Sequence, residues 1–332
     1  MTTSSSTASK DTIISGNDVP IDIAVLIPCH NEELAIRTVV EDFRQAMPSA
    51  RIFVYDNNST DRTIEEAQAA RAIVKTEPQQ GKGNVVRRMF ADIEAEVYIL
   101  VDGDNTYEAA AAPRLVEMLL EQSLDMVTGR RVTNIKGAYR PGHMLGNRVL
   151  SGLVAGVFGK RTTDMLSGYR VFSRRFVKSF PALSRGFEIE TELTVHALEL
   201  RMPIADMDTV YVDRLTGSST KLSTFKDGLR IFRVILSLVK EERPFQFFGA
   251  ISIILIFISL LLGYPIFAEF LETGLVPRLP TAILAASIVV IAVLSLLAGL
   301  ILDTVTLGRR EMKRLAYLSV SPVGDFKETS KR

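Results

Sequence analysis

Two long apolar runs near the carboxyl end constrain this chain more than any other feature. They extend from Phe245 to about Phe270 and from about Thr281 to Leu302. Each can cross a hydrocarbon layer, for which a helix needs roughly 20 residues. A buried helix of a soluble protein is the alternative, but two consecutive runs of this length favour membrane spans. The sequence therefore predicts two transmembrane helices within residues 244–304.

The charges beside these runs predict their orientation. Cations precede the first run and follow the second: Lys240, Arg243, Arg309, Arg310, Lys313 and Arg314. The connector carries more acid than base: Glu269, Glu272 and Arg278. Because positive charge is retained on the cytoplasmic side, we expect both ends in the cytoplasm and a multi-pass hairpin in the cell (inner) membrane. The central parts of both runs lack ionisable residues, which favours an anchor over an ion pathway.

Three flanking segments complete the expected organisation. Residues 1–18 are rich in Ser and Thr without the apolar core of a signal peptide, and we expect a disordered tail. Residues 223–243 carry apolar side chains at helical spacing with cations between them. This pattern predicts an amphipathic juxtamembrane helix in the membrane surface, the alternative being a helix packed on the soluble domain. Residues 305–332 are expected to form a cytoplasmic tail.

Charge and cysteine content exclude some classes of function. The formal net charge is +1, which lacks the basic excess of a nucleic-acid-binding surface, so we expect no nucleic acid as partner. Cys29 is the single cysteine and cannot form an internal disulfide. The soluble part is therefore expected in a reducing compartment.

Residues 19–222 alternate between short apolar runs and helical patterns. The runs predict strands at 23–27, 51–55, 72–75, 97–101 and 125–129, with helices at 32–46, 61–70, from 81–83 onward and 108–122. Such alternation predicts an α/β domain with a mostly parallel sheet and helices on both faces. In open sheets of this kind the ligand binds beyond the carboxyl ends of the strands.

Polar clusters follow three of the expected strands: Asn31-Glu32, Asp56-Asn57-Asn58 and Asp102-Gly103-Asp104. They should therefore meet in one crevice. The two carboxylates of Asp102 and Asp104 repel each other unless a cation lies between them. Their oxygen atoms at a nucleotide site favour a hard cation, Mg²⁺ or Mn²⁺, as cofactor.

A family resemblance rests on four motifs in order: Pro28-Cys29-His30-Asn31-Glu32-Glu33, Asp56-Asn57-Asn58-Ser59-Thr60-Asp61, Gly81-Lys82-Gly83 and Asp102-Gly103-Asp104. The set resembles the family-2 glycosyltransferases, in particular the branch of dolichol-phosphate mannose synthase-like and bacterial polyprenyl-phosphate glycosyltransferases with a C-terminal membrane hairpin. The resemblance covers about residues 20–245 in motif order. It implies a GT-A-type nucleotide-binding fold over residues 19–222.

The resemblance also implies roles on the donor side. Pro28, Asn31 and Glu32 would line the nucleotide pocket, and Asp56 would contact the base or ribose. Asp102 and Asp104 would hold the metal and the diphosphate, with Asp104 in a catalytic role. Lys82 is either a phosphate contact or a solvated charge at a helix start. Asp-Asn-Asn stands here where many relatives carry Asp-Asp-Gly, so uridine and guanosine both stay open as the base.

Later motifs resemble the acceptor side of the same branch: Asp164-Met165-Leu166-Ser167-Gly168-Tyr169-Arg170, Gly186-Phe187-Glu188-Ile189-Glu190, and Arg214 to Lys221. By analogy Asp164 lies near the transferred sugar, and Arg214, Ser219 and Lys221 close over the donor diphosphate. A lipid phosphate is already anionic at neutral pH and needs cations more than a base. The arginines suited to it are Arg130, Arg131, Arg148 and Arg170. A hydroxyl acceptor would need a carboxylate base, Asp164 or Glu190.

Together these features predict an inverting, metal-dependent glycosyltransferase at the cytoplasmic membrane face. It would move a hexose-type sugar from a UDP- or GDP-sugar to a polyprenyl (undecaprenyl or dolichyl) phosphate. Two alternatives stay open: transfer to a hydroxyl of a glycan or glycolipid, and a non-catalytic membrane adaptor that binds nucleotide-sugar. Assembly into a homo-oligomer also stays open, because no small-residue pattern in the spans decides it.

Overall fold

The computed structural model describes residues 21–132, 164–184, 186, 188–212, 240–241 and 243–323. These residues form two compact units, one from the chain before residue 228 together with residues from 313 onward, the other from 229–312. Each unit is described by itself. The tail expected at 1–18 and most of the amphipathic helix expected at 223–243 lie outside the described residues.

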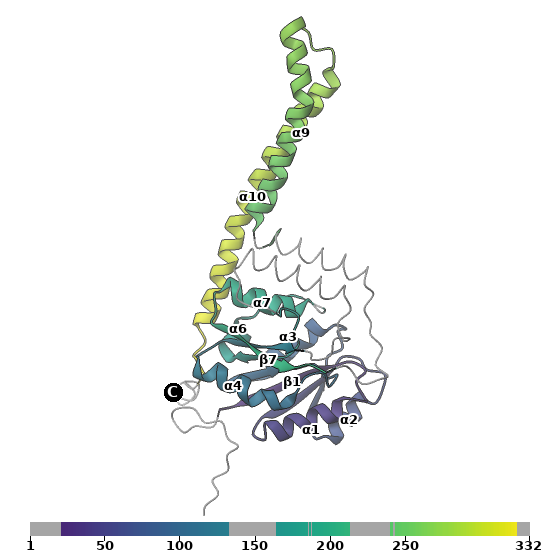
Figure 1. Cartoon of the computed structure of the whole chain (residues 1–332), viewed down its shortest axis with the longest axis vertical. Coiled ribbons are helices and arrows are strands. Elements are labelled where there is room, and N and C mark those ends of the chain that lie inside the picture. The colour runs from purple at the N-terminus through teal and green to yellow at the C-terminus, as the bar shows by residue number, and fades with distance from the viewer. Residues whose placement is uncertain are drawn as a thin grey trace, which may run out of the picture. The chain divides into compact units, whose positions relative to one another are not determined.

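The first unit is built on a mixed sheet with the strand order β3-β2-β1-β4-β6-β5-β7 (Figure 1). The strands are β1 Ile23–Cys29, β2 Arg51–Asp56, β3 Ile73–Thr76, β4 Val97–Leu100, β5 Met126–Val132, β6 Arg170–Ser173 and β7 Ile204–Val210. β1 pairs in parallel with both β2 and β4, so that Val25 lies opposite Ile52 and Ile99. β6 is antiparallel to both of its neighbours, β4 and β5. The predicted mostly parallel α/β sheet is confirmed.

Helices cover both faces of this sheet, because alternate side chains of a strand point to opposite faces. Ile23, Val25 and Ile27 pack toward one layer and Ala24 and Leu26 toward the other. The first layer contains α1 Ile36–Ala46, α2 Thr63–Ala69, the 3₁₀ turn η1 Ala109–Ala111 and α4 Ala112–Glu121. The second contains α3 Lys82–Asp92, α6 Arg174–Ser179 and α7 Ile189–Glu199, as Figure 1 shows.

Several elements differ from their expected bounds. The helix expected from residue 32 begins at Ile36, after a turn in which the carbonyl of Glu32 accepts hydrogen bonds from the amides of Ala35 and Ile36. The helix expected over 108–122 opens as the 3₁₀ turn η1 before α4 begins. β6 and β7 were not among the expected strands, and β6 introduces the antiparallel pairing.

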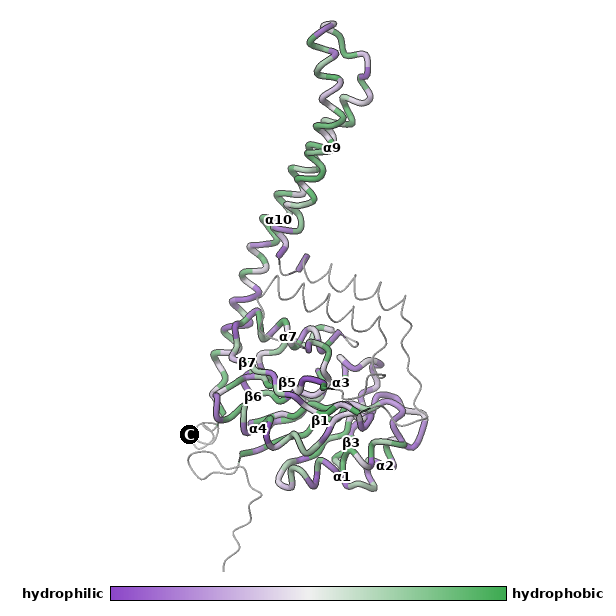
Figure 2. Tube along the Cα trace, viewed as in Figure 1, coloured by the Kyte–Doolittle hydropathy of each residue, from purple (hydrophilic) through white to green (hydrophobic). Residues whose placement is uncertain are grey.

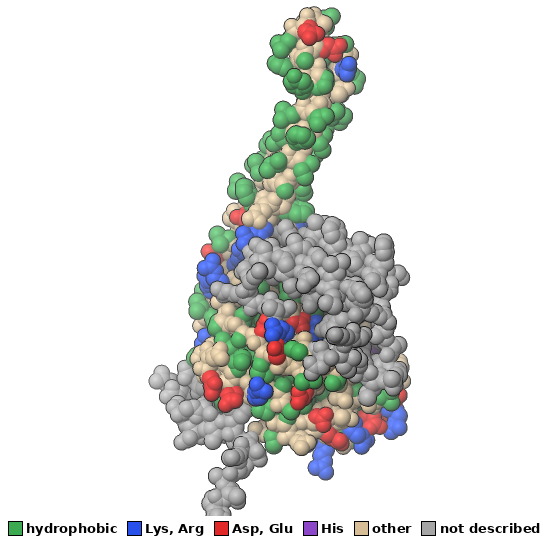
Figure 3. Space-filling view, viewed as in Figure 1, with side chains coloured by type: hydrophobic (Ala, Val, Ile, Leu, Met, Phe, Trp, Pro, Cys, Tyr) green, Lys and Arg blue, Asp and Glu red, His purple; other side chains and the backbone are tan. Residues whose placement is uncertain are grey.

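The second unit contains two long helices, α9 Pro244–Thr273 and α10 Leu279–Leu318 as far as residue 312. Both are hydrophobic along most of their length (Figure 2), and by length and composition they can cross a membrane. Most of their large apolar side chains are exposed, and charged side chains gather near the connector (Figure 3). α9 ends at Gly274, whose φ of 70° stops the helix with a left-handed residue.

A seam of mostly small residues lies between these two helices. The buried positions recur every seven residues: Ser252, Ser259 and Ile266 on α9, and Ala285, Ala292, Gly299 and Thr306 on α10. The Ser259 hydroxyl donates to the carbonyl of Ala285 at 2.8 Å. A spacing of seven keeps one stripe of a helix facing its partner, and small side chains let the two backbones approach closely.

The last turns of α10 belong to the first unit. The sequence predicts a tail from residue 305, whereas the helix continues to Leu318 beyond the end of the apolar run. Lys313 Nζ lies 2.6 Å from Glu199 Oε2, and the Tyr317 hydroxyl donates to Asp125 Oδ2 at 2.7 Å. Val323 packs against the layer that contains α1 and α4. The apolar run therefore predicts where the membrane-spanning part of α10 ends, but the helix itself continues with polar residues beyond it.

Candidate active site

The candidate site lies beyond the carboxyl ends of β1, β2 and β4, which are neighbours in the sheet. The chain leaves each strand through an asparagine with a left-handed backbone: Asn31 (φ 56°), Asn58 (φ 60°) and Asn105 (φ 58°). Asparagine tolerates this conformation better than most residues. The strand order changes direction between β1 and β4, which is where open α/β sheets bind their ligands.

Asn31 and Glu32 join the loop after β1 to the loop after β2. The Asn31 amide donates to Ser59 Oγ at 2.8 Å, and Asn31 Oδ1 accepts from the Thr60 amide at 2.8 Å. The Glu32 amide donates to Thr63 Oγ1 at 2.8 Å. These bonds fix the shape of the loop pair beside Asp56. That Asn31, Glu32 and Pro28 line a nucleotide pocket stays a prediction.

Asp56 presents a buried carboxylate at the end of β2. Its side chain is 1% exposed, and Oδ2 accepts from the Ser59 amide at 3.1 Å. Oδ1 is buried and has no hydrogen-bond partner among the described residues. A buried oxygen without a partner is costly and needs an explanation, and a donor group of a bound ligand would supply one.

Asn57, next to Asp56, holds the loop that precedes α3. Its side-chain amide donates to the carbonyls of Glu77 at 2.8 Å and Gln79 at 2.9 Å. Its Oδ1 accepts from the Gly81 amide at 2.7 Å. The second position of the Asp-Asn-Asn motif therefore shapes the loop that leads to Lys82.

Asp102 and Asp104 follow β4. Asp104 is buried, and its Oδ1 accepts from Thr106 Oγ1 at 2.6 Å. Asp102 is partly buried, and the backbone of Gly168 packs directly on its carboxylate, so that a Cβ at this position would overlap the carboxylate oxygens. The Gly168 amide donates to the Tyr107 hydroxyl at 2.9 Å, which fixes this close approach.

Lys82 lies between two carboxylates. Its Nζ is 2.5 Å from Asp102 Oδ1 and 2.5 Å from Glu190 Oε1, and its side chain is 10% exposed. Burial alone would lower the pKa of Lys82, but the two carboxylates outweigh it and raise that pKa above its usual value, so the ammonium stays protonated. Lys82 starts α3 and Glu190 lies in the first turn of α7, so the ion pairs connect these two helices with the loop after β4.

The carboxylates at this site fit a divalent cation that arrives with phosphate. Within the described part of the chain, no group of three or more His, Cys, Asp or Glu side chains could hold a metal ion by itself. Asp102 and Asp104 supply two hard oxygen donors. Mg²⁺ commonly takes one or two carboxylates from a protein and the rest of its ligands from substrate phosphates and water.

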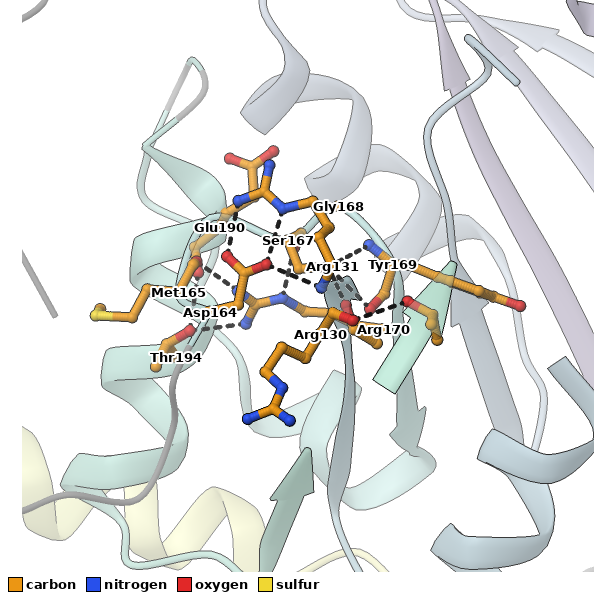
Figure 4. Close-up of polar contacts among 12 residues, drawn as sticks. Arg130, Arg131, Asp164, Met165, Ser167, Gly168, Tyr169, Arg170, Glu190 and Thr194 are labelled. Carbon is orange, nitrogen blue, oxygen red and sulfur yellow. Dashed lines mark hydrogen bonds and ion pairs between the residues drawn. The ribbon is translucent and has the colours of Figure 1, made fainter. Parts of the chain in front are cut away.

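Arg131 and Asp164 form a two-point ion pair (Figure 4). Arg131 Nε and Nη2 donate to the two carboxylate oxygens at 2.8 Å and 2.7 Å. Burial alone would raise the pKa of Asp164, but the hydrogen bonds and charge of Arg131 outweigh it and hold that pKa below its usual value. Asp164 is therefore ionised and a weak proton acceptor at neutral pH.

Arg170 does not fit its expected role as a phosphate ligand. Its side chain has no exposed surface, and its guanidinium donates inside the protein to the Ser167 carbonyl at 3.0 Å, the Met165 carbonyl at 2.6 Å and Thr194 Oγ1 at 2.8 Å (Figure 4). These hydrogen bonds of the Arg170 guanidinium hold the turn before β6 against α7. An acceptor phosphate would not reach it in this structure.

The remaining expected residues divide into exposed and undescribed positions. Arg130 is exposed and pairs with Asp208 across β5 and β7. Arg148, Arg214, Ser219 and Lys221 lie outside the described residues. The sequence did not single out Tyr107, and Gly168 stood only as a member of the motif Asp164 to Arg170, without a role of its own. Both residues are close in sequence to expected site residues: Tyr107 ends the run Asp102-Gly103-Asp104-Asn105-Thr106-Tyr107, and Gly168 follows Asp164 by four residues.

Comparison with known proteins identifies the family. The model of glycosyl transferase family 2 matches residues 24–180. The glycosyltransferase AglJ of Haloferax volcanii is 32% identical over 302 residues, which are 90% of this chain and 99% of AglJ. The chain therefore belongs to glycosyltransferase family 2, as the motifs predict.

A second relative and a solved structure extend the comparison. The dolichyl-phosphate hexose transferase of Haloferax volcanii is 28% identical over 67% of this chain and 96% of its own length. The glucosyl-3-phosphoglycerate synthase of Mycobacterium tuberculosis, solved with Mn²⁺, UDP and glucosyl-3-phosphoglycerate, superposes with a TM-score of 0.55. That match covers 66% of this chain and 79% of the synthase at 23% identity, and it confirms the GT-A-type fold.

Proposed function

We propose that this glycosyltransferase moves a hexose-type sugar from a UDP- or GDP-sugar to a polyprenyl phosphate at the cytoplasmic face of the membrane. A phosphate oxygen of the acceptor attacks the anomeric carbon while the bond to the nucleotide diphosphate breaks. The diphosphate leaves with the bonding electron pair, and the configuration of the sugar inverts. The relative that acts as a dolichyl-phosphate hexose transferase supports this choice of acceptor.

The pairing of Asp164 with Arg131 is the observation that carries this proposal. A hydroxyl acceptor must lose a proton to a base, and an effective base has a pKa near the working pH. Asp164 has a lowered pKa instead, and Glu190, the other candidate, is ion-paired with Lys82. A phosphate monoester needs no base, because it is already ionised at neutral pH. The site therefore suits an anionic acceptor better than a neutral alcohol.

The donor side is assigned to the ends of β1, β2 and β4. The unpartnered Oδ1 of Asp56 is placed to accept a hydrogen bond from the nucleoside. Asp102 and Asp104 would hold Mg²⁺ or Mn²⁺, which supplies positive charge to the departing diphosphate. The solved neighbour that contains Mn²⁺ and UDP supports this assignment. Lys82 adds a protonated ammonium to the same side of the site.

The two apolar helices give the proposed acceptor its location. A polyprenyl chain dissolves in the hydrocarbon layer, and its phosphate lies at the surface. We propose that α9 and α10 span the membrane as a hairpin whose connector, with Glu269 and Glu272, lies on the non-cytoplasmic side. The cations that follow the apolar part of α10 then lie on the cytoplasmic side, as the positive-inside rule requires.

A donor panel tests the enzymatic part of this proposal. The full chain in detergent is supplied with labelled UDP- and GDP-sugars, undecaprenyl phosphate, and either Mg²⁺, Mn²⁺ or a chelator. We expect label in the lipid with one nucleotide class, loss of transfer with chelator, and loss with Asp104→Asn. Hydrolysis of the donor without label in the lipid would point to a hydroxyl acceptor. Binding of a nucleotide-sugar without any turnover would identify the adaptor alternative.

A further inference from the structure

Lys82 connects the two halves of the site through a single ammonium group. Its Nζ contacts Asp102, which follows β4 on the donor side, and Glu190, which begins α7 on the acceptor side, both at 2.5 Å. The lysine side chain is 10% exposed and that of Glu190 is 8% exposed. Solvent screens the attraction between charges buried to this extent only weakly.

The ammonium contacts one of the two oxygens of a carboxylate that a cation at this site would use. Lys82 approaches Oδ1 of Asp102, while the backbone of Gly168 packs on the same carboxylate and limits its rotation. A divalent cation and an ammonium at hydrogen-bond distance cannot share that oxygen without strong repulsion. Asp102 therefore has one cationic partner at a time on this side.

We propose that Lys82 is a positioning residue that holds Asp102 when the site is empty and releases it when the cation enters with the donor diphosphate. Release of Asp102 leaves the ammonium on Glu190, so the arrival of the donor changes the charge balance at the start of α7. The donor and the acceptor halves are coupled in this way. The inference rests on the proposed function for the identity of the donor and deepens the role of Lys82 beyond that of a phosphate contact.

The proposal predicts that Lys82 weakens cation binding when no donor is present. The test measures the dissociation constant of Mn²⁺ alone for the full chain in detergent, by the electron paramagnetic resonance signal of free Mn²⁺. Lys82→Met should bind Mn²⁺ about tenfold more tightly than the wild type, because a unit charge near the cation is removed. The matched control is Lys75→Met, which removes the same charge from an exposed lysine paired with Asp92. Its affinity should equal that of the wild type.

A double variant separates local competition from net charge. Lys82→Met with Glu190→Gln removes one positive and one negative charge, so the formal charge around Asp102 equals that of the wild type. In Lys82→Met alone, the buried Glu190 carboxylate loses its cationic partner, and this variant can fail to fold. The double variant removes that carboxylate as well, so it can be measured in place of the single variant. Tighter Mn²⁺ binding by the double variant supports competition for Asp102. An affinity equal to that of the wild type would overturn the proposal.

Four further outcomes show which hypothesis a failure would reject. Asp104→Asn added to Lys82→Met should remove the gained affinity, which locates the cation at this carboxylate pair. Absence of Mn²⁺ binding in every variant would overturn the proposal, because no cation site would have been uncovered. Unchanged Mn²⁺ affinity beside normal sugar transfer would reject the role of Lys82 alone. Tighter binding without transfer to a lipid phosphate would reject only the proposed function.

Discussion

Arg131 and Asp164 form a two-point ion pair that joins the end of β5 to the turn before β6. The guanidinium donates through Nε and Nη2, and the Arg131 amide also donates to Asp164 Oδ2 at 3.3 Å. Two parallel hydrogen bonds between charged groups fix both side chains in one orientation. The pair keeps Asp164 ionised and leaves a cation beside the proposed acceptor position.

Asp164→Asn should destabilise the protein, because Arg131, whose side chain is 17% exposed, loses the buried carboxylate that is its counter-ion. Removal of one partner from a buried pair costs about 3–5 kcal/mol. We expect a lower midpoint of thermal unfolding for Asp164→Asn at pH 7. A midpoint equal to that of the wild type would show that the pair contributes little to folding.

The difference in unfolding midpoint between wild type and Asp164→Asn should depend on pH, because the pKa of Asp164 is lowered in the folded protein. Because the pKa of Asp164 is lower in the folded than in the unfolded protein, ionised Asp164 stabilises the folded state at any pH above its unfolded pKa of about 3.9. This stabilisation is lost as the pH falls through the pKa of Asp164 in the folded protein. The gap between wild type and Asp164→Asn should therefore be full at pH 7 and narrow below about pH 4. Unfolding midpoints recorded from pH 7 to pH 3 measure it. A gap that widens toward acid would contradict the assignment.

Gly168→Ala should impair sugar transfer through Asp102. A methyl group at position 168 would overlap the Asp102 carboxylate and displace it. Displacement of a catalytic group by about 1 Å can lower a rate on the order of 100-fold. Initial rates of transfer measure the effect, with Gly249→Ala as control because a Cβ there meets no atom within 4 Å. Equal rates for the two variants would refute the importance of this contact.

The half of the site formed by β1, β2 and β4 was predictable from sequence, because these strands are continuous apolar runs with polar residues at their ends. Ile23-Ala24-Val25-Leu26-Ile27 and Val97-Tyr98-Ile99-Leu100 are buried on both faces and cannot face water. Three such strands in an alternating chain place their carboxyl ends side by side. The crevice beyond β1, β2 and β4 follows from that pattern.

The half of the site near β5, β6 and β7 was less predictable. β6 is a short strand that starts with the buried Arg170, and β7 carries Asp206 and Asp208 among its residues, so neither shows an apolar run. The sequence also cannot show which groups accept the hydrogen bonds of a given guanidinium. Arg131 and Arg170 look alike in the chain, yet one lies in a two-point pair with Asp164 and the other is enclosed by backbone carbonyls.

Gly299→Leu should weaken the hairpin of α9 and α10. A Cβ at Gly299 would lie 2.9 Å from the Cβ of Phe248, so a larger side chain must push the helices apart. We expect a lower midpoint of thermal aggregation in detergent. Gly308→Leu is the control on the same helix, because a Cβ there meets no atom within 4 Å. Identical midpoints for both variants would exclude the seam as a packing surface.

The proposed hairpin topology predicts the side on which added cysteines react. Cys29 is buried, and burial first, then the nearby carboxylates, raises the pKa of its thiol, so it should not react. In intact spheroplasts, a membrane-impermeant maleimide should label Glu272→Cys in the connector. It should label Ser319→Cys only after lysis. Labelling of Ser319→Cys in intact cells would reverse the proposed orientation.

A matched pair of acceptors tests the central claim most directly. The donor identified by the nucleotide panel is supplied with undecaprenyl phosphate or with undecaprenol, which differ only in the phosphate, and the initial rate of label entering the lipid is measured. The proposal predicts rapid transfer to the phosphate and no transfer above background to the alcohol. Equal or faster transfer to the alcohol would contradict it, because the site would then supply the base that the pairing of Asp164 with Arg131 argues against.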